Sequence, residues 1–280
     1  MSSFTLRARL CAGGILAGLW SGPAAPAAAQ PAAPPDFSSN QVGWVGLGAG
    51  GPSFAAVAGR LAPVGDDPAH PFVPNGTRAQ PTYRIADLSN PNLKPWVKER
   101  MKKDNDEVLA GKIAYTARSS CKPAGIPAFM AFGGANPLYF IQTPKQVWLI
   151  FSGDQQVRRV YLDMPHSAHP KPSWYGESIG PYEGDTLVID TTGQNDKTVV
   201  DPYRTPHTEK LHVVERWTMI DGGQALQASF TGDDTEAFYE PWSGMRRYRR
   251  VREPMAEDVC AENNQHLFDY HIPVANEPDF

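Results

Sequence analysis

The side chains best suited to chemistry lie between residues 163 and 215, at the ends of predicted strands and in the polar loops between them. They are carboxylates and imidazoles, the groups that most often transfer protons in enzymes near neutral pH. The candidate catalytic residues are Asp163, His166, Asp190, His207 and Glu215. In this hypothesis Glu215 and His207 transfer protons, and the other three orient a ligand.

Glu215 is singled out by its place in the predicted strand over residues 211–219. Side chains alternate between the two faces of a strand, so Glu215 shares its face with Leu211, Val213 and Trp217. Desolvation on this apolar face would raise the pKa of the carboxyl and suit it to acid–base chemistry. The structural alternative is an ion pair with an inward-facing arginine, for which the candidates are Arg159, Arg247 and Arg249.

The other candidates also have structural alternatives. Asp163 and Asp190 each end a predicted strand, where a carboxylate can meet a ligand or cap backbone N–H groups. His166 and His169 are three residues apart, and His207 and His212 are five apart; neither spacing is a zinc signature. We therefore predict no metal site and no cofactor, and a metal near His207 and His212 is the alternative.

Aromatic side chains are frequent in the same region and predict contact with a flat, apolar ligand. The candidate substrate-binding residues are Tyr161, Trp174, Tyr175, His212 and Trp217. The alternative is that the aromatic rings form the packed core.

Eight short apolar runs separated by turn signals indicate strands that position these residues. They cover residues 138–143, 146–152, 157–163, 175–182, 186–191, 211–220, 226–232 and 245–251. The pattern predicts an all-β fold, an eight-stranded antiparallel barrel of lipocalin-like kind, with an irregular N-terminal arm and one helix over residues 94–110. A β-sandwich is the alternative architecture.

The chain divides into five predicted segments. Residues 1–29 have the basic start, short apolar core and small-residue end of a signal peptide, with cleavage near Ala29. The others are a Pro/Gly/Ala-rich arm (30–85), a helix with a connecting segment (86–135), the β-barrel domain (136–265) and a C-terminal tail (266–280). We therefore expect a periplasmic or secreted protein without a membrane span.

Charge and cysteine content agree with export. Without residues 1–29 the chain has 24 Lys+Arg and 30 Asp+Glu, an acidic balance that argues against nucleic acid as a partner. Cys121 and Cys260 then remain, and two cysteines in an oxidising compartment predict a disulfide. Nothing in the sequence indicates an oligomeric state.

Several runs resemble motifs of a large group of exported bacterial proteins of mostly unassigned function. They span roughly residues 115–265 and include residues 178–180, 183–191, 195–198, 206–209, 211–213, 215–216, Cys260 and 262–264. The resemblance implies a secreted, β-rich domain and attaches no substrate or reaction to it.

Two functional hypotheses follow. The first is an exported enzyme that acts on a small apolar or aromatic metabolite by acid–base chemistry, as a cofactor-independent lyase, isomerase or cyclase. The second is a non-catalytic barrel that binds or carries such a ligand. Titratable groups that converge inside the barrel would favour the first hypothesis.

Overall fold

The computed structural model describes residues 33–38, 42–47, 54–73, 83–131, 136–153 and 156–260. Strands are its main regular structure. The residues from Pro34 onward belong to one unit. The predicted signal peptide, residues 1–29, and the predicted tail, residues 266–280, lie outside the described residues.

The observed strands match the predicted runs closely and add three short ones. They are β1 (Gly43–Gly46), β2 (Ala55–Ala56), β3 (Leu138–Gln142), β4 (Gln146–Phe151), β5 (Gln156–Leu162), β6 (Glu177–Gly180), β7 (Tyr182–Glu183), β8 (Thr186–Thr192), β9 (His212–Ile220), β10 (Ala225–Asp233) and β11 (Trp242–Val251). The α-helices of the described residues are α1 (Pro95–Leu109) and α2 (Ala128–Ala131), and the 3₁₀ turns are Ala117–Ser120 and Asp221–Gly223.

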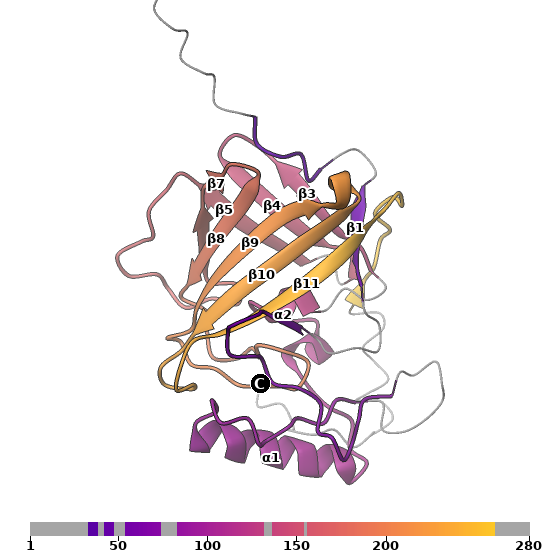
Figure 1. The fold of residues 1–280 in the computed structure, drawn as a ribbon, viewed down its shortest axis with the longest axis vertical. Helices are drawn as coiled ribbons and strands as arrows, with labels where there is room; N and C mark the ends of the chain where they lie inside the picture. Colours follow the sequence, from indigo (N-terminus) through magenta and orange to yellow (C-terminus); the bar gives the residue numbers. More distant parts are fainter. Residues whose placement is uncertain are drawn as a thin grey trace, which may run out of the picture. The chain divides into compact units, whose positions relative to one another are not determined.

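The strands close into a barrel (Figure 1). Within the described residues the ring has nine strands, in the order β1, β3, β4, β5, β6, β8, β9, β10 and β11, and β11 pairs back onto β1. This last pairing runs from Gly43 opposite Val251 to Gly46 opposite Tyr248. The predicted closed barrel is thus confirmed in place of a sandwich, and its strand number is corrected from eight to nine.

β1 is a barrel strand that was not expected from the sequence, because it lies in the glycine-rich stretch assigned to the arm. A Cβ on Gly43 would lie only 2.6 Å from the Cβ of Pro137, so the close approach of the chain at this point requires glycine. Trp44 beside it is fully buried and donates a hydrogen bond from Nε1 to the carbonyl of Phe37 at 2.9 Å. Gly43 lies in a stretch with the composition of a linker, but here the glycine allows two parts of the chain to pack closely.

Two neighbouring pairs in the ring share few residues. β5 and β6 are parallel and pair only at Tyr161 with Ile179 and at Leu162 with Gly180. β1 and β3 pair only at Trp44 with Leu138. Each of these seams has too few backbone hydrogen bonds to hold by itself, so side chains must contribute there.

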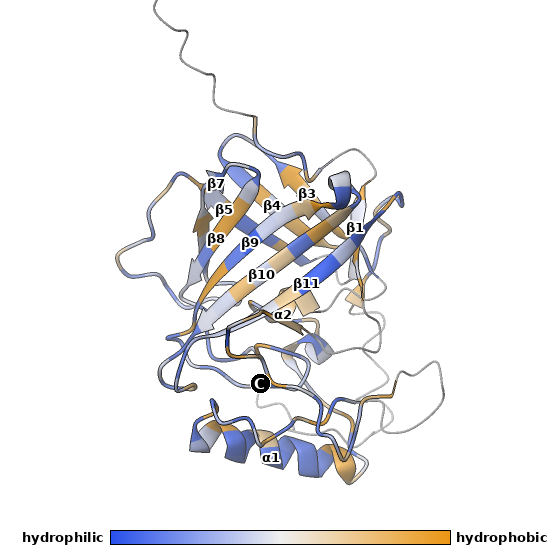
Figure 2. Cartoon of the chain, viewed as in Figure 1, coloured by the Kyte–Doolittle hydropathy of each residue, from blue (hydrophilic) through white to orange (hydrophobic). Residues whose placement is uncertain are grey.

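Inward-facing side chains fill the barrel. The Trp217 ring lies 5.6 Å from Phe140 and 5.7 Å from Tyr248, centroid to centroid, and all three belong to one hydrophobic cluster with Trp44. Figure 2 shows hydrophobic and hydrophilic residues alternating along β9, β10 and β11, as expected for strands with one buried face. Because Trp44 and Trp217 have no exposed surface at all, neither lines a void that could hold a water molecule.

α1 lies beyond one end of the barrel and is mostly hydrophilic (Figures 1 and 2). Pro95 occupies its first turn, as predicted, and its buried edge contains Val97, Met101 and Val108. Asn105, also buried, donates to the carbonyl of Ala86 at 2.9 Å and accepts from its N–H at 3.0 Å. The helix thus fastens the segment before it to this end of the barrel.

The predicted disulfide between Cys121 and Cys260 is present, with Cα atoms 5.6 Å apart. It fastens the segment that follows β11, whose Glu253 carbonyl also accepts a hydrogen bond from Tyr139 Oη at 2.8 Å on the outer wall of β3. No helix in the described part of the chain is long and apolar enough to cross a membrane.

Candidate functional site

Glu215 lies inside the barrel and is paired with Arg158. The guanidinium donates from Nη1 to Oε1 at 3.0 Å and from Nη2 to Oε2 at 2.5 Å, and both side chains are completely buried. Arg158 also donates to the hydroxyls of Ser178 and Thr191, at 3.2 and 2.8 Å. The inward arginine is therefore Arg158, and not one of the three candidates taken from the sequence.

This arrangement gives Glu215 a structural role. Both of its oxygens accept hydrogen bonds from one guanidinium, the geometry of a strong bidentate pair. It has no contact with solvent through which a ligand could reach it. The expectation that Glu215 meets a ligand in a barrel cavity is therefore not met.

His207 lies apart from Glu215 and is also buried. Its Nδ1 lies 2.9 Å from the carbonyl of Thr208, which can only accept, so Nδ1 carries the proton. Its Nε2, 2.7 Å from Thr198 Oγ1, then accepts from that hydroxyl. Burial lowers the pKa of His207 and keeps the ring neutral. With both nitrogens occupied, His207 holds its loop and is not placed to transfer protons.

Four titratable side chains do converge, on the outer wall of the barrel. Asp190 Oδ1 on β8 lies 2.9 Å from His166 Nε2 and 2.9 Å from His212 Nε2. His166 Nδ1 lies 3.0 Å from Glu177 Oε1 on β6. The side chains are partly exposed, from 24% for His166 to 43% for His212. We call these four residues, His166, Glu177, Asp190 and His212, the outer cluster.

The contacts in the outer cluster shift the pKa values of its members. The hydrogen bond from His212 holds the pKa of Asp190 below its usual value, and the bond from His166 adds to this effect. The same Asp190 bond raises the pKa of His212, and the nearby charge of Asp233 raises it further. Hydrogen bonds from Ser167 lower the pKa of Glu177. Each shift stabilises the charged form of its group.

The two imidazoles of the outer cluster are not equivalent. Both ring nitrogens of His166 face carboxylate oxygens, so neither is available to a ligand. His212 uses only Nε2, and within the described residues no hydrogen bond involves its Nδ1. His212 is therefore the one of the two that can exchange a proton with a bound molecule.

The remaining predicted residues are dispersed. Asp163 is exposed at the turn after β5, with a left-handed backbone (φ 54°), and is not in the outer cluster. Tyr161 is half-buried on β5, opposite Ile179, which is itself opposite Asp190. The Trp174 ring is half-buried, and its centroid lies 5.9 Å from Lys122 Nζ. Trp217 belongs to the packed core, and the partly buried Tyr175, which contacts Phe129, packs against that core.

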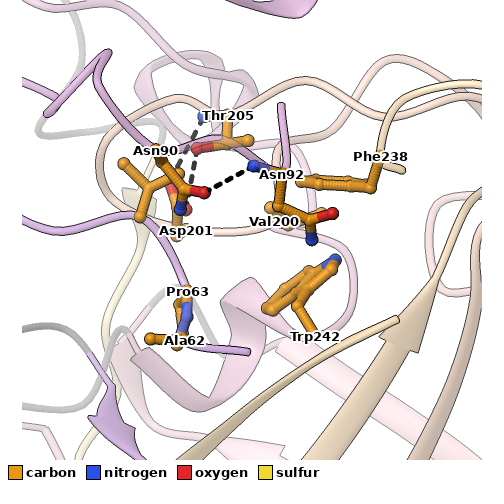
Figure 3. Close-up of a pocket in the computed structure, with 10 residues that line it drawn as sticks. Ala62, Pro63, Asn90, Asn92, Val200, Asp201, Thr205, Phe238 and Trp242 are labelled. Atoms are coloured by element: carbon orange, nitrogen blue, oxygen red, sulfur yellow. Dashed lines mark hydrogen bonds between the residues drawn. The ribbon is translucent and has the colours of Figure 1, made fainter. Parts of the chain in front are cut away.

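Figure 3 shows a small pocket at the end of the barrel, formed by four segments that are far apart in the sequence. Its cavity volume is about 10 Å³, room for about one water molecule. It is lined by Ala62, Pro63, Val64, Asn90, Asn92, Val200, Asp201, Thr205, Phe238 and Trp242. Burial raises the pKa of Asp201 to about 6, although Thr205 donates hydrogen bonds to its carboxylate. Trp242 Nε1 has no hydrogen-bond partner among the described residues.

Comparisons with known proteins identify no relative: no family model, curated protein or solved structure matches the chain. In the described ranges no group of three or more His, Cys, Asp or Glu side chains has the geometry to hold a metal ion. The candidate site is therefore defined by the geometry of the outer cluster alone.

Replacing Glu215 with Gln should destabilise the fold strongly, because Arg158 would remain buried without its counter-charge. The expected loss is about 3–5 kcal/mol in the free energy of unfolding, measured by urea denaturation. The matched control is Arg158→Met with Glu215→Leu, which removes both charges and should cost much less. A Glu215→Gln protein as stable as wild type would contradict the structural role of the pair.

Replacing Asp190 with Asn should lower the pKa of His212, because the ring loses the carboxylate that stabilises its charged form. Because the pKa of His212 is raised in the folded state, its contact with Asp190 stabilises the fold below about pH 6.5. This contribution to the free energy of unfolding is lost as the pH rises through the folded-state pKa. NMR titration of the His212 ring, assigned with His212→Gln, measures the shift. Asp221→Asn, in the turn between β9 and β10, should leave the His212 pKa unchanged.

Proposed function

We propose that this protein is an exported enzyme that transfers a proton to or from a small apolar or aromatic molecule, in a lyase, isomerase or cyclase type of reaction. His212 is the proton-transferring residue and Asp190 its orienting partner. The observation that carries the proposal is the 2.9 Å contact between Asp190 Oδ1 and His212 Nε2, on a partly exposed ring whose Nδ1 has no hydrogen-bond partner among the described residues.

The chemistry follows from this contact. An ionised carboxylate can only accept, so Asp190 keeps the proton of neutral His212 on Nε2 and leaves the Nδ1 lone pair for a substrate proton. The same carboxylate stabilises the imidazolium that forms after proton uptake, as the aspartate of a catalytic triad does. The raised pKa of His212 also strengthens it as a base near neutral pH.

The outer wall around His212 supports an apolar or aromatic substrate. In the strand register Tyr161, Ile179, Asp190 and Val214 lie opposite one another across β5, β6, β8 and β9, on the same face as the outer cluster. Two of these side chains are aliphatic and one is aromatic, and all are half-buried. They provide a half-buried, mainly apolar stretch of the outer wall that includes Asp190, the partner of His212.

Export is supported by the disulfide, since disulfides persist in oxidising compartments. The signal-like start of the sequence and its resemblance to exported bacterial proteins support the same location.

A deuterium exchange experiment tests the proposed reaction across several classes of substrate at once. The protein is incubated with a panel of small ketones, enones and hydroxylated aromatics in D₂O, and C–H exchange is followed by NMR. His212→Gln should slow any exchange that is found by about 10²–10⁴-fold. His169→Gln, an exposed histidine outside the outer cluster, should not change the rate. Equal rates in wild type and His212→Gln would rule out His212 as the base.

The second candidate function is non-catalytic binding of a small apolar molecule, and the pocket of Figure 3 favours it. Its walls are mainly apolar, and Asp201 and Trp242 provide a few polar atoms, a composition typical of ligand pockets. With room for about one water molecule, this pocket must widen to admit such a ligand.

Binding of 4-fluorophenol, followed by ¹⁹F NMR, tests the second candidate. Val200→Phe should fill the pocket and abolish binding, while Val157→Phe, on the exposed outer wall, should leave it intact. Binding that survives Val200→Phe, or that is absent from the wild type, would exclude this pocket.

A further inference from the structure

His166 is held between two carboxylates and cannot move freely. Its Nδ1 lies 3.0 Å from Glu177 Oε1, and its Nε2 lies 2.9 Å from Asp190 Oδ1. Glu177 is fixed in turn by Ser167, whose N–H donates to Oε1 at 2.6 Å and whose hydroxyl donates to Oε2 at 2.5 Å. A continuous chain of polar contacts thus runs from Ser167 through Glu177 and His166 to Asp190.

The chain ends on the same oxygen that His212 contacts. Asp190 Oδ1 lies 2.9 Å from a ring nitrogen of each histidine, so the position of His166 fixes the direction from which this oxygen faces His212. Asp190 is 37% exposed, and a carboxylate at such a position would otherwise rotate and exchange its contacts with water. A fixed orienting group is what proton transfer in a partly exposed site requires.

We infer that Glu177 and His166 are positioning residues, which hold the Asp190 carboxylate in the orientation that directs His212 Nδ1 toward a substrate. The inference rests on the proposed proton-transfer role of His212. Each member of the outer cluster then has one role. Glu177 holds His166, which in turn holds Asp190. Asp190 orients His212, and His212 alone contacts the reacting atom.

The competing explanation is that these bonds only fasten the connection between β5 and β6 to the barrel wall. Both explanations predict some loss of stability when Glu177 is removed. Only the positioning role predicts a change in the chemistry of His212, so the test must include a property of that ring.

Diethyl pyrocarbonate provides such a test, because it acylates an unprotonated imidazole nitrogen that is free to react. Mass spectrometry of the wild type should show modification of His212 and protection of His166. In Glu177→Ala, His166 should become reactive, and the pH at which His212 is half-reactive should fall toward the value in Asp190→Asn. Proton exchange, if found, should slow by about 10–100-fold in kcat with little change in KM.

Three variants serve as controls. Glu177→Gln can still accept from His166 and donate to Ser167, so it should keep His166 protected. Asp233→Asn removes a charge that acts on His212 but is not a partner of His166, and it reports how much of the shift is due to charge alone. If Glu177→Ala does not fold, Glu177→Asp keeps the charge, shortens the reach by one methylene and should also expose His166.

The outcomes separate the two proposals. Protected His166 in Glu177→Ala, or a His212 titration shifted no more than in Asp233→Asn, would overturn the positioning role. A shifted titration without any effect of His212→Gln on proton exchange would support the chain of contacts and refute the proton-transfer function.

Discussion

The buried ion pair of Arg158 and Glu215 is the interaction on which the rest of the barrel depends. It spans the seam where parallel β5 and β6 share only two residue pairs, and it links four strands through Ser178 and Thr191. The outer cluster lies on the opposite face of the same strands, because side chains alternate: Glu177 precedes Ser178 on β6, and Asp190 precedes Thr191 on β8. The inner pair therefore fixes the backbone from which the candidate site extends, and a half-exposed site can remain well ordered.

Most of the fold could be predicted from the sequence, since all eight apolar runs proved to be strands and the helix begins at a proline. Two features of the fold could not be predicted from the sequence. β1 has the composition of a linker, because its Gly43 is required by contact with a residue far along the chain, which no local pattern records. The parallel pairing of β5 with β6 depends on the path of a long connection and not on the strands themselves.

The candidate site was harder to predict, and the reasons differ between residues. Arg158 shares its strand face with Val160 and Leu162, so strict alternation would have selected it over Arg159 as the partner of Glu215. The sequence pattern does indicate Asp190, His166 and His212 as candidates. It does not indicate that they contact one another, because these contacts depend on strand register and on the path of the chain after β5. Glu177 lies eleven residues after His166 and forms no motif with it, so only the folded chain brings the two together.

The closing strand has a consequence for how the barrel forms. β1 joins the ring through one residue pair with β3 and four with β11, and no buried ion pair comparable to Arg158–Glu215 is found there among the described residues. Closure also pairs β1 with β11, about 200 residues further along the chain, so the ring has a high contact order and cannot be completed until β11 is in place. Until then the edges of β3 and β11 are open to pairing with another chain. The competition between closure of the barrel and pairing with another chain thus depends on β1, a strand of four residues of which two are glycine.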